Sequence, residues 1–404
     1  MADAQMPERL RNVIVGGGIG GLAAALALSS AGLPVTLLER VARPADVGAG
    51  IALHPNGLAV LYGLGLREHL RRTAFSTREG TLGIGSRRYT LPVPDYGDGL
   101  DHALALPRAR LYQVLREAIA ARGADLRFGH EVLGAAPDGR VEVRAPDGGV
   151  YEIDADVVVG ADGIGSAVRD GAEFGVRRTA TPGIAVRALL PGDPFGGREL
   201  ELWTEEGLAV GAPMGDGTSY LALSASRGPM RRAMTEGDLA TLRRLAGRIL
   251  PDGESLLASV RGFGDLLVNP IVTVTCERWQ DGRLALLGDA AHAMTPHLGQ
   301  GANSALLDAY VLVEELARDQ ARPAAIARYA SRRRPGVTRV QRMSRTYMAV
   351  SENTTMPVVR QARDVLMAAL LPLAGRRSPL DLFLQENPAR TYAAVRRLVP
   401  SAPR

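Results

Sequence analysis

The sequence predicts an α/β fold: a Rossmann-like nucleotide-binding domain, an inserted domain built on an antiparallel sheet, and helices at the C-terminal end. Three observations predict this fold. Residues 13–39 read as an apolar strand, a glycine-rich turn, an apolar helix and a second strand. Residues 174–269 read as short strands separated by Gly and Pro, with a helical interlude. An apolar strand followed by a helix then returns in residues 284–318.

These changes of texture divide the chain. We expect the nucleotide-binding domain to comprise residues 1–75, 101–173 and 270–335, the inserted domain residues 76–100 and 174–269, and a C-terminal helical region residues 336–404. Within the first domain, a short helix is expected from about Pro55 and an amphipathic helix after Pro107.

Composition excludes several classes of function. The 404 residues carry a formal net charge of +5, and no lysine is present, so all 48 basic residues are arginine. Schiff-base and P-loop chemistry are therefore excluded. The arginines are dispersed except in residues 331–345, which we interpret as a solvated helix face and not as a nucleic-acid or membrane contact.

The single cysteine, Cys276, rules out an intramolecular disulfide and a Cys-based metal site, and we expect it to be a packed apolar residue. We expect no metal ion. Neither the first residues nor the apolar segment 365–375, which contains Pro372, resembles a leader or a membrane span. The expectation is therefore a cytoplasmic protein without stable membrane association.

The first glycine-rich turn predicts a dinucleotide site. Gly16, Gly18 and Gly21 have the spacing at which the first glycine permits a tight turn, the second lets a pyrophosphate approach, and the third allows close packing of helix and strand. Glu39 ends the second strand, where a carboxylate can accept a hydrogen bond from a ribose hydroxyl.

A second strand-to-helix turn occurs far along the chain. Gly288 and Asp289 end an apolar strand, and Pro296, Gly299 and Gly301 precede a helix. The carboxyl edge of an open sheet is where ligands bind, and an Asp at this edge can hold the hydroxyls of a polyol. One long dinucleotide satisfies both turns. FAD, with ADP at one end and ribityl isoalloxazine at the other, is long enough.

Three sequence fingerprints occur in order: "GGGIGG" with Glu39, "GADGIGSAVR" at residues 160–169, and "GDAAHAMTPHLGQGANSALLDA" at residues 288–309; "PRARL" at residues 107–111 adds a fourth match. With these, the chain resembles the flavin-dependent aromatic monooxygenases of the para-hydroxybenzoate hydroxylase fold, which include salicylate hydroxylases and tetracycline-inactivating oxygenases. The fingerprints cover most of the flavin domain, about half of the chain. The inserted domain matches only in texture.

The resemblance implies roles for individual residues. The cofactor-binding set is Gly16, Gly18 and Gly21 at the pyrophosphate, Glu39 and Arg40 at the AMP end, Arg108 at the pyrophosphate or ribityl, Asp162 in a mainly structural, nicotinamide-linked role, Gly288 and Asp289 at the ribityl, and Pro296, Gly299, Gly301, Ala302 and Asn303 along the isoalloxazine. The start of the second helix would stabilise negative charge on reduced flavin. The alternative for Asp162 is a turn residue without a ligand.

Candidates for chemistry and substrate binding are fewer. The catalytic set is His297 with Pro296 and Gly299, whereas His292 is more simply a packed residue. His54 either faces the flavin ring or caps the helix at Pro55. The substrate candidates are His54 and, from the inserted domain, Arg187, Trp203, Met214 and Tyr220. The segment 346–372 is expected to pack over the flavin domain or the pocket mouth, with a dimer contact as the alternative.

The expected function is hydroxylation of an aromatic or polycyclic small molecule through a C4a-hydroperoxyflavin, with noncovalent FAD, O2, and NADH or NADPH as a transient reductant. The first alternative is a Baeyer–Villiger or epoxidising monooxygenase on the same scaffold. The second is an FAD-dependent prenyl reductase. A tryptophan-type halogenase is disfavoured because the chain has no lysine and Trp203 and Trp279 are far apart. A flavin-binding sensor would not explain the inserted domain. The chain is expected to be a monomer or a homodimer.

Overall fold

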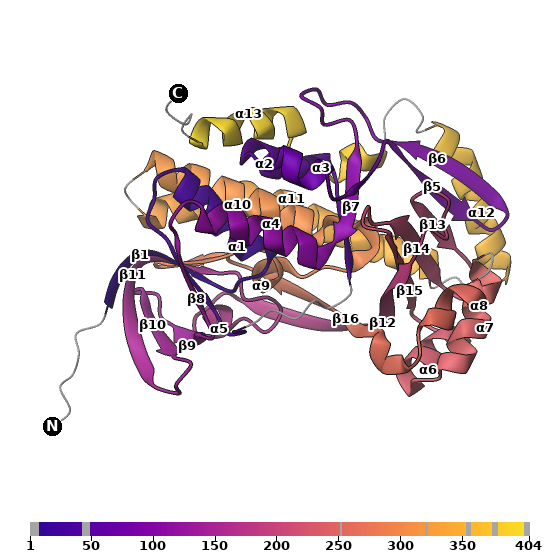
Figure 1. Cartoon of the computed structure of the whole chain (residues 1–404), viewed down its shortest axis with the longest axis horizontal. Coiled ribbons are helices and arrows are strands. Elements are labelled where there is room, and N and C mark those ends of the chain that lie inside the picture. The colour runs from indigo at the N-terminus through magenta and orange to yellow at the C-terminus, as the bar shows by residue number, and fades with distance from the viewer. Residues whose placement is uncertain are drawn as a thin grey trace.

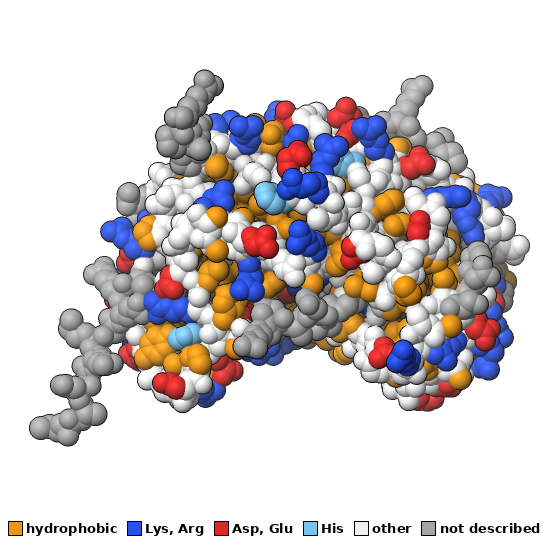
Figure 2. All heavy atoms as spheres, in the orientation of Figure 1, with side chains coloured by type: hydrophobic (Ala, Val, Ile, Leu, Met, Phe, Trp, Pro, Cys, Tyr) orange, Lys and Arg blue, Asp and Glu red, His pale blue; other side chains and the backbone are white. Residues whose placement is uncertain are grey.

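The structure, a computed structural model, describes residues 8–42, 49–250, 253–319, 322–352, 357–373 and 379–399. Two large β-sheets lie toward opposite ends of the molecule, and helices cover the first of them (Figure 1). The predicted fold class, with a Rossmann-like parallel sheet, an antiparallel sheet and C-terminal helices, is confirmed. On the face in Figure 2, arginine side chains are interspersed with acidic ones.

The first sheet contains the predicted Rossmann-like strands. In spatial order these are β17 (Gln280–Asp281), β18 (Leu284–Leu286), β11 (Val150–Gly160), β1 (Glu8–Val15), β2 (Thr36–Glu39) and β8 (Asp125–Phe128), with β10 (Arg140–Arg144) beside β11 and β9 (Glu131–Ala135) beside β10. From β18 to β8 the neighbouring strands are parallel. Their carboxyl ends therefore meet at one edge of the sheet, where ligands bind in folds of this type.

The helices that follow these strands begin at the same edge. They are α1 (Ile19–Ser30), α5 (Ala167–Asp170), α9 (Asp289–His292) and α10 (Gln300–Arg318), whereas α4 (Arg108–Ala120) follows β7 (Ala103–Pro107) and leads into β8. Helix α1 packs against both α4 and α10. A Cβ atom on Gly20 would lie 2.8 Å from Leu287 Cδ1 and 3.1 Å from Ala305 Cβ, so a glycine is needed where α1 meets α10. The two glycine-rich turns consequently lie on neighbouring helices.

A further layer packs on the outer side of α10. It consists of α2 (Pro55–Gly63), α3 (Arg67–Arg71) and α13 (Pro388–Leu398), together with a small sheet of β3 (Gly50–Leu53), β7 (Ala103–Pro107) and β4 (Phe75–Thr77). Helix α2 lies between α10 and α13. The predicted helix starts at Pro55 and after Pro107 are confirmed.

The second sheet is antiparallel except where β13 meets β5. Its order is β16 (Leu267–Cys276), β12 (Val176–Pro191), β15 (Thr218–Ala225), β14 (Leu208–Pro213), β13 (Leu200–Trp203), β5 (Glu79–Ile84) and β6 (Arg87–Pro92). One face buries leucines against three helices, α6 (Gly228–Glu236), α7 (Leu239–Ile249) and α8 (Gly253–Leu256). On the opposite face Arg187, Tyr220, Ala222 and Val210 stay partly exposed. This open face is turned toward the first domain's small sheet, because Tyr220 packs with Ala105 and Phe75.

The C-terminal helices differ from expectation in one respect. Helix α11 (Arg322–Glu352) runs without a break through Pro335, so the expected division at residue 336 falls inside it.

The end of α11 and helix α12 (Pro357–Leu373) pack against the second sheet, where Tyr347, Val350 and Met367 join the apolar cluster that contains Trp203. These side chains pack on the apolar residues at the adjoining ends of β13 and β14. Glu352 at the end of α11 also contacts His297 in the turn before α10, so the segment 346–372, expected over the flavin domain or the pocket mouth, touches both sheets' domains. Residues 353–356 of the predicted segment lie outside the described residues.

Candidate active site

The first glycine-rich turn has the geometry of a phosphate cradle. Gly16 has φ 105°, and a Cβ on Gly21 would lie 2.0 Å from the Gly16 carbonyl oxygen, so both positions require glycine. A Cβ on Gly18, in contrast, would meet no atom within 4 Å. Gly18 precedes α1, and no side chain caps the N-terminus of that helix. The backbone amides are therefore free to face an anion in open space.

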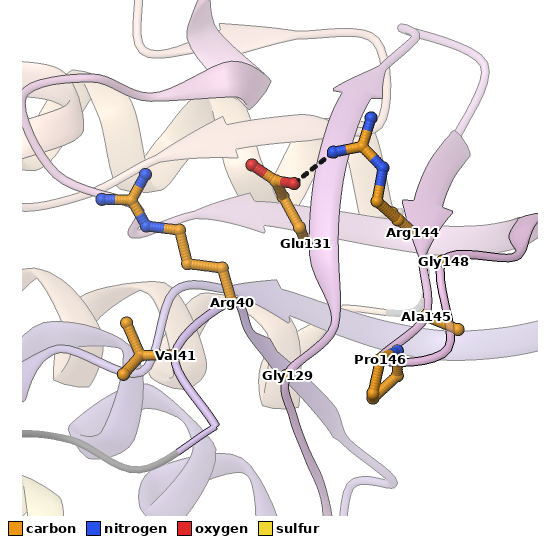
Figure 3. Close-up of a pocket in the computed structure, with 8 residues that line it drawn as sticks. All are labelled: Arg40, Val41, Gly129, Glu131, Arg144, Ala145, Pro146 and Gly148. Atoms are coloured by element: carbon orange, nitrogen blue, oxygen red, sulfur yellow. Dashed lines mark hydrogen bonds and ion pairs between the residues drawn. The ribbon is translucent and has the colours of Figure 1, made fainter.

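Glu39 is tied to this turn. One carboxylate oxygen accepts a 2.6 Å hydrogen bond from Gly17 N, and the other accepts one of 2.8 Å from Val41 N. Beside it lies a hollow of about 390 Å³, shown in Figure 3. Arg40 lines the hollow together with Glu131 and Arg144, whose side chains form a 2.6 Å ion pair. The structure thus places Glu39 and Arg40 together beside the first turn.

Two further predicted residues lie close to this edge. Arg108 starts α4, its side chain is exposed, and no described residue pairs with its guanidinium group. Asp162 follows β11 and accepts hydrogen bonds from Ala167 N at 2.7 Å and Val168 N at 3.3 Å through one oxygen. Its other oxygen is buried without a partner, and burial raises the pKa of this carboxyl. The hydrogen bonds to the first oxygen support the structural role.

The second strand-to-helix turn presents a free carboxylate. Gly288 has φ 59° and donates its N–H to Asp308 Oδ2 at 3.1 Å. Asp289 begins α9 with its side chain exposed, and no described residue bonds to it. Such a carboxylate at the carboxyl edge of β18 can accept hydrogen bonds from the hydroxyls of a polyol, as the sequence predicted.

His292 belongs to a buried cluster that the sequence did not reveal. Its Nε2 lies 2.5 Å from Asp308 Oδ2, and its ring stacks on Trp279 with centroids 4.9 Å apart. Arg333 Nε donates to Asp308 Oδ1 at 2.8 Å. Burial alone would raise the pKa of Asp308, but the charges and hydrogen bonds of His292 and Arg333 hold it below its usual value. Arg333 is itself buried, so the predicted solvated face of residues 331–345 is wrong at this position.

The turn predicted to line the isoalloxazine leads into the N-terminus of α10 and lies next to His54. Gly299, with φ 61°, is the N-cap of α10, and no side chain caps this helix. A Cβ on Gly301 would meet nothing within 4 Å, whereas one on Gly299 would lie 3.1 Å from His54 Nε2. Gly301 and Ala302 are both partly exposed. The start of α10 thus offers a second open, uncapped helix end at the same edge as the first.

His54 lies against this second helix end. It occupies the N-cap position of α2, but its side chain makes no capping hydrogen bond, so the capping alternative is not supported. Burial lowers its pKa to about 4 and its Nδ1 has no partner. The imidazole is therefore neutral at ordinary pH. Its contact with Gly299 favours the alternative in which His54 faces the flavin.

Asn303 and His297 face protein in the structure. Asn303 Oδ1 accepts a hydrogen bond from His54 N at 3.0 Å, and its Nδ2 donates to Gly299 O at 2.8 Å and Ala52 O at 3.1 Å. The side chain of His297, in the 3-10 turn η3 (Pro296–Leu298), is fully buried, and its Nε2 lies 2.6 Å from Glu352 Oε1. Both side chains therefore bond to protein groups around the turn and fix its shape.

The substrate candidates from the inserted domain divide into two groups. Arg187 and Tyr220 lie on neighbouring strands β12 and β15, on the open face of the second sheet. Arg187 donates to Asn269 Oδ1 at 2.9 Å and has no carboxylate partner among the described residues. Burial raises the pKa of Tyr220, and the nearby Arg187 acts in the opposite direction. This pair can hold an anionic oxygen.

Trp203 and Met214 are packed more tightly. Trp203 is buried, its Nε1 donates to Glu201 Oε1 at 2.6 Å, and its ring meets that of Tyr347 edge to face. Met214 is buried next to Ala212 and Tyr220. Both side chains are therefore packed within protein, Trp203 beside Tyr347 and Met214 beside Tyr220. Glu201, whose carboxylate also accepts a 2.5 Å bond from Tyr347 Oη, was not predicted.

Other sequence expectations concern residues away from this site. Cys276 is buried, and burial raises its pKa to about 11, so it is a packed residue and not a nucleophile. Within the described ranges, no group of three or more His, Cys, Asp or Glu side chains could hold a metal ion. None of the described helices is both long and apolar enough to cross a bilayer.

Comparison with known proteins defines the class. A family model described as "FAD binding domain" matches residues 9–344. The chain is 32% identical over 372 residues to a 3-amino-4-hydroxybenzoate 2-monooxygenase of Streptomyces cremeus, covering 83% of this chain and 86% of that protein. It is 29% identical over 377 residues to a 2-heptyl-3-hydroxy-4(1H)-quinolone synthase of Mycobacteroides abscessus, covering 90% and 94%.

Among solved structures, the tetrameric form of 2-methyl-3-hydroxypyridine-5-carboxylic acid oxygenase matches with a TM-score of 0.74 and 27% identity, covering 88% of this chain and 96% of that chain. The chain therefore belongs to the FAD-binding flavoprotein monooxygenase family with the para-hydroxybenzoate hydroxylase fold. It is an FAD-dependent monooxygenase, an oxidoreductase of an NAD(P)H-dependent family, and its homologues hydroxylate aromatic or heterocyclic substrates.

The residues of this chain fit the cofactor. Two uncapped helix N-termini, at α1 and α10, open at one edge, and the Cβ positions of Gly18 and Gly301 are empty. The exposed Arg108 and Asp289 supply polar groups along that edge. An elongated dinucleotide with a central pyrophosphate would use all of these groups.

The open space at Gly18 gives a first prediction. Gly18→Ala should leave the unfolding of the apoprotein unchanged within about 0.5 kcal/mol, because the methyl group meets no protein atom and φ −70° suits alanine. FAD binding should weaken about tenfold or more, because the methyl group occupies the space for the pyrophosphate. Flavin fluorescence titration measures this. Unchanged FAD affinity would show that the pyrophosphate does not lie over this turn.

The matched variant is Gly21→Ala. Its methyl group would lie 2.0 Å from the Gly16 carbonyl oxygen, so it should destabilise the apoprotein itself by about 1–3 kcal/mol. Urea unfolding of both apoproteins separates the two effects. Equal destabilisation by the two substitutions would contradict the assigned geometry.

The buried cluster gives a second prediction. Asp308→Asn should destabilise the apoprotein by about 3–5 kcal/mol, because it leaves the Arg333 guanidinium buried without its counter-ion. Glu386→Gln is the control, since Glu386 pairs with the partly exposed Arg332 and should change stability by no more than about 1 kcal/mol. Urea unfolding at neutral pH measures both. A similar small effect for both variants would show that the cluster is not a stabilising element.

The same cluster sets the direction of a pH effect. The folded pKa of Asp308 lies below its usual value, so its stabilising contribution is complete above about pH 4 and is lost as pH falls through the folded pKa. The difference in stability between the wild type and Asp308→Asn should therefore shrink on acidification. A difference that grows toward low pH would contradict this assignment.

Proposed function

We propose that the enzyme hydroxylates an aromatic or polycyclic small molecule that carries an acidic group, with NADH or NADPH as a transient reductant and O2 as co-substrate. The observation that carries this proposal is the Arg187–Tyr220 pair on the open face of the second sheet. A partly exposed guanidinium group without a carboxylate partner, next to a phenol, suits a phenolate or a carboxylate of the substrate.

FAD, when bound, would accept a hydride from NAD(P)H and activate O2, so that one oxygen atom enters the substrate and the other leaves as water. In this proposal Gly16, Gly18 and Gly21 bind the pyrophosphate, Glu39 and Arg40 hold the AMP end, and Arg108 and Asp289 hold the middle of the cofactor. The FAD is bound noncovalently, so acid precipitation should leave the yellow chromophore in the supernatant.

The turn before α10 shapes the reacting end. The helix N-terminus at Gly299 and Gly301 favours negative charge nearby without a charged side chain. His54 is neutral at ordinary pH, so it adds no charge of its own. Pro296, His297 and Gly299 contribute through the path of the backbone, because the His297 side chain is enclosed by protein. The buried His297 side chain also keeps water away from the side of the turn that faces Glu352.

The test uses the purified holoenzyme with NADH and NADPH in turn and a panel of phenols, aromatic acids and polycyclic ketones. We expect at least one acidic aromatic compound to stimulate oxygen consumption and to gain one atom of 18O from 18O2. An oxygen atom inserted next to a ketone or into an alkene would instead indicate the Baeyer–Villiger or epoxidising alternative. Substrate reduction without oxygen consumption would indicate the reductase and overturn the proposal.

Arg187 gives a third prediction. Arg187→Gln should raise KM for the acidic substrate about 10–100-fold, because a charged hydrogen bond is lost, while the substrate-independent oxidation of NAD(P)H stays close to wild type. Arg177→Gln on the same strand is the control, since Arg177 is exposed near the far end of β12. Equal KM changes for the two variants, or for a substrate analogue without the acidic group, would contradict the assigned role.

A further inference from the structure

The turn that precedes α10 is fastened along helix α11. Gln341 Nε2 donates to Ala293 O at 3.2 Å, and Ser344 Oγ donates to Thr295 O at 2.7 Å. Glu352, the last residue of α11, lies 2.6 Å from His297 Nε2. The segment from Ala293 to His297 is thus held by three side chains of one helix. Only Glu352 among these three carries a charge.

Glu352 also fastens the second sheet. Ser224 Oγ on β15 donates to Glu352 Oε1 at 2.6 Å, and Ser226 Oγ, directly after β15, donates to Oε2 at 2.6 Å. The side chains of Glu352 and His297 are both 0% exposed. One carboxylate therefore joins three parts of the molecule: the turn before α10, the second sheet and the end of α11.

The positions of the protons in this cluster follow from which groups donate hydrogen bonds to Glu352. The two serine hydroxyls donate to this carboxylate, and His297 Nε2 donates to it in the tautomer that carries a proton on Nε2. His297 Nδ1 is buried without a partner among the described residues. The other ionisable groups nearby are Glu201, Tyr347, which bonds to Glu201, and Arg363, which donates to Val350 O.

Simple packing does not explain this arrangement. A well-packed apolar residue at such a site is usually at least as stabilising as a buried charge, and the charge persists only where several donors satisfy it. The carboxylate of Glu352 fixes orientation, because each hydrogen-bond donor must point at it. The His297 ring and the backbone of η3 therefore have one position relative to β15.

We propose that Glu352 is a positioning residue for the flavin: through His297 it holds the Pro296–Gly299 turn at the isoalloxazine in register with the substrate-binding face of the second sheet. This inference rests on the proposed function, in which that turn lines the cofactor. Ser224 lies on β15 two residues after Ala222 and four after Tyr220, so Glu352 binds one of the two strands that carry the proposed substrate side chains.

The test measures bound FAD directly and needs no substrate. Glu352→Gln keeps the size of the side chain but removes the charge and one acceptor. We expect it to weaken FAD binding to the apoprotein about tenfold and to change the visible circular dichroism of the bound flavin. His297→Gln should do the same. The double variant should be no worse than either single variant, because both residues act through one contact.

The matched control is Glu315→Gln. Glu315 is a largely buried carboxylate that joins α10 to α11 through Arg328, but it lies 15 residues from the start of α10, about 22 Å along the helix. It should lower the unfolding midpoint of the apoprotein to a similar extent and leave FAD affinity and the flavin spectrum unchanged. If Glu352→Gln fails to fold, Ser226→Ala replaces it, since it removes only one donor from the carboxylate. We then expect a change of about threefold in the same direction.

The outcomes are distinguishable. An FAD affinity and a flavin spectrum that are unchanged in Glu352→Gln, while Gly18→Ala weakens FAD binding, would overturn the positioning role and leave the proposed function intact. No change in either variant would place the cofactor elsewhere and overturn both. Additive effects of Glu352→Gln and His297→Gln on FAD affinity would show that Glu352 does not act through His297.

Discussion

The carboxylate of Asp308 is the constraint on which the second half of the cofactor edge depends. It accepts hydrogen bonds from the Gly288 amide, His292 and Arg333, and it does so at 0% exposure. The first two bonds fix the path of the chain between β18 and α9, and the third joins that path to α11. A charge this deep is tolerable only with its full set of donors, so the turn, α10 and α11 can assemble in only one arrangement.

Given that arrangement, the position of the two glycine-rich turns follows from sheet geometry. β1 and β18 run parallel with β11 between them, so the helices that follow them begin at the same edge. Gly20 lets α1 and α10 pack closely, which brings the two open helix ends near each other. Neither end has a capping side chain, and an uncapped end in open space leaves amide groups that only water or an anionic ligand can satisfy. The pair of turns is therefore an argument for one extended cofactor and not for two separate ligands.

Local patterns in the sequence were enough to predict the strands, the glycine turns and residues that face open space, such as Gly18 and Asp289. They could not predict the buried ion pairs, because the partners are far apart in the chain: Asp308 and Arg333 are 25 residues apart, and His297 and Glu352 are 55 apart. Arg333 was missed for a reason that the sequence does contain. It stands four residues after Tyr329 and four before Val337, both buried, so helical spacing puts it on the buried face of α11 despite its basic neighbours. For Glu352 no such signal exists, because its donors Ser224 and Ser226 come from a strand whose register only the folded structure fixes.

The chain contains no lysine, so no lysine side chain stabilises negative charge at the turn before α10, which we propose lines the flavin. The N-terminus of α10 favours negative charge at the turn, and this backbone feature does not titrate. His54, the imidazole against that end, is held neutral by burial, and the His297 side chain faces Glu352. The position of α10 therefore contributes to the electrostatic environment of the turn without any titrating group. The chemistry of such a site depends on where the helix lies. Three separate elements of the fold, α11, β15 and the β18–α9 turn, hold the residues on either side of the start of α10.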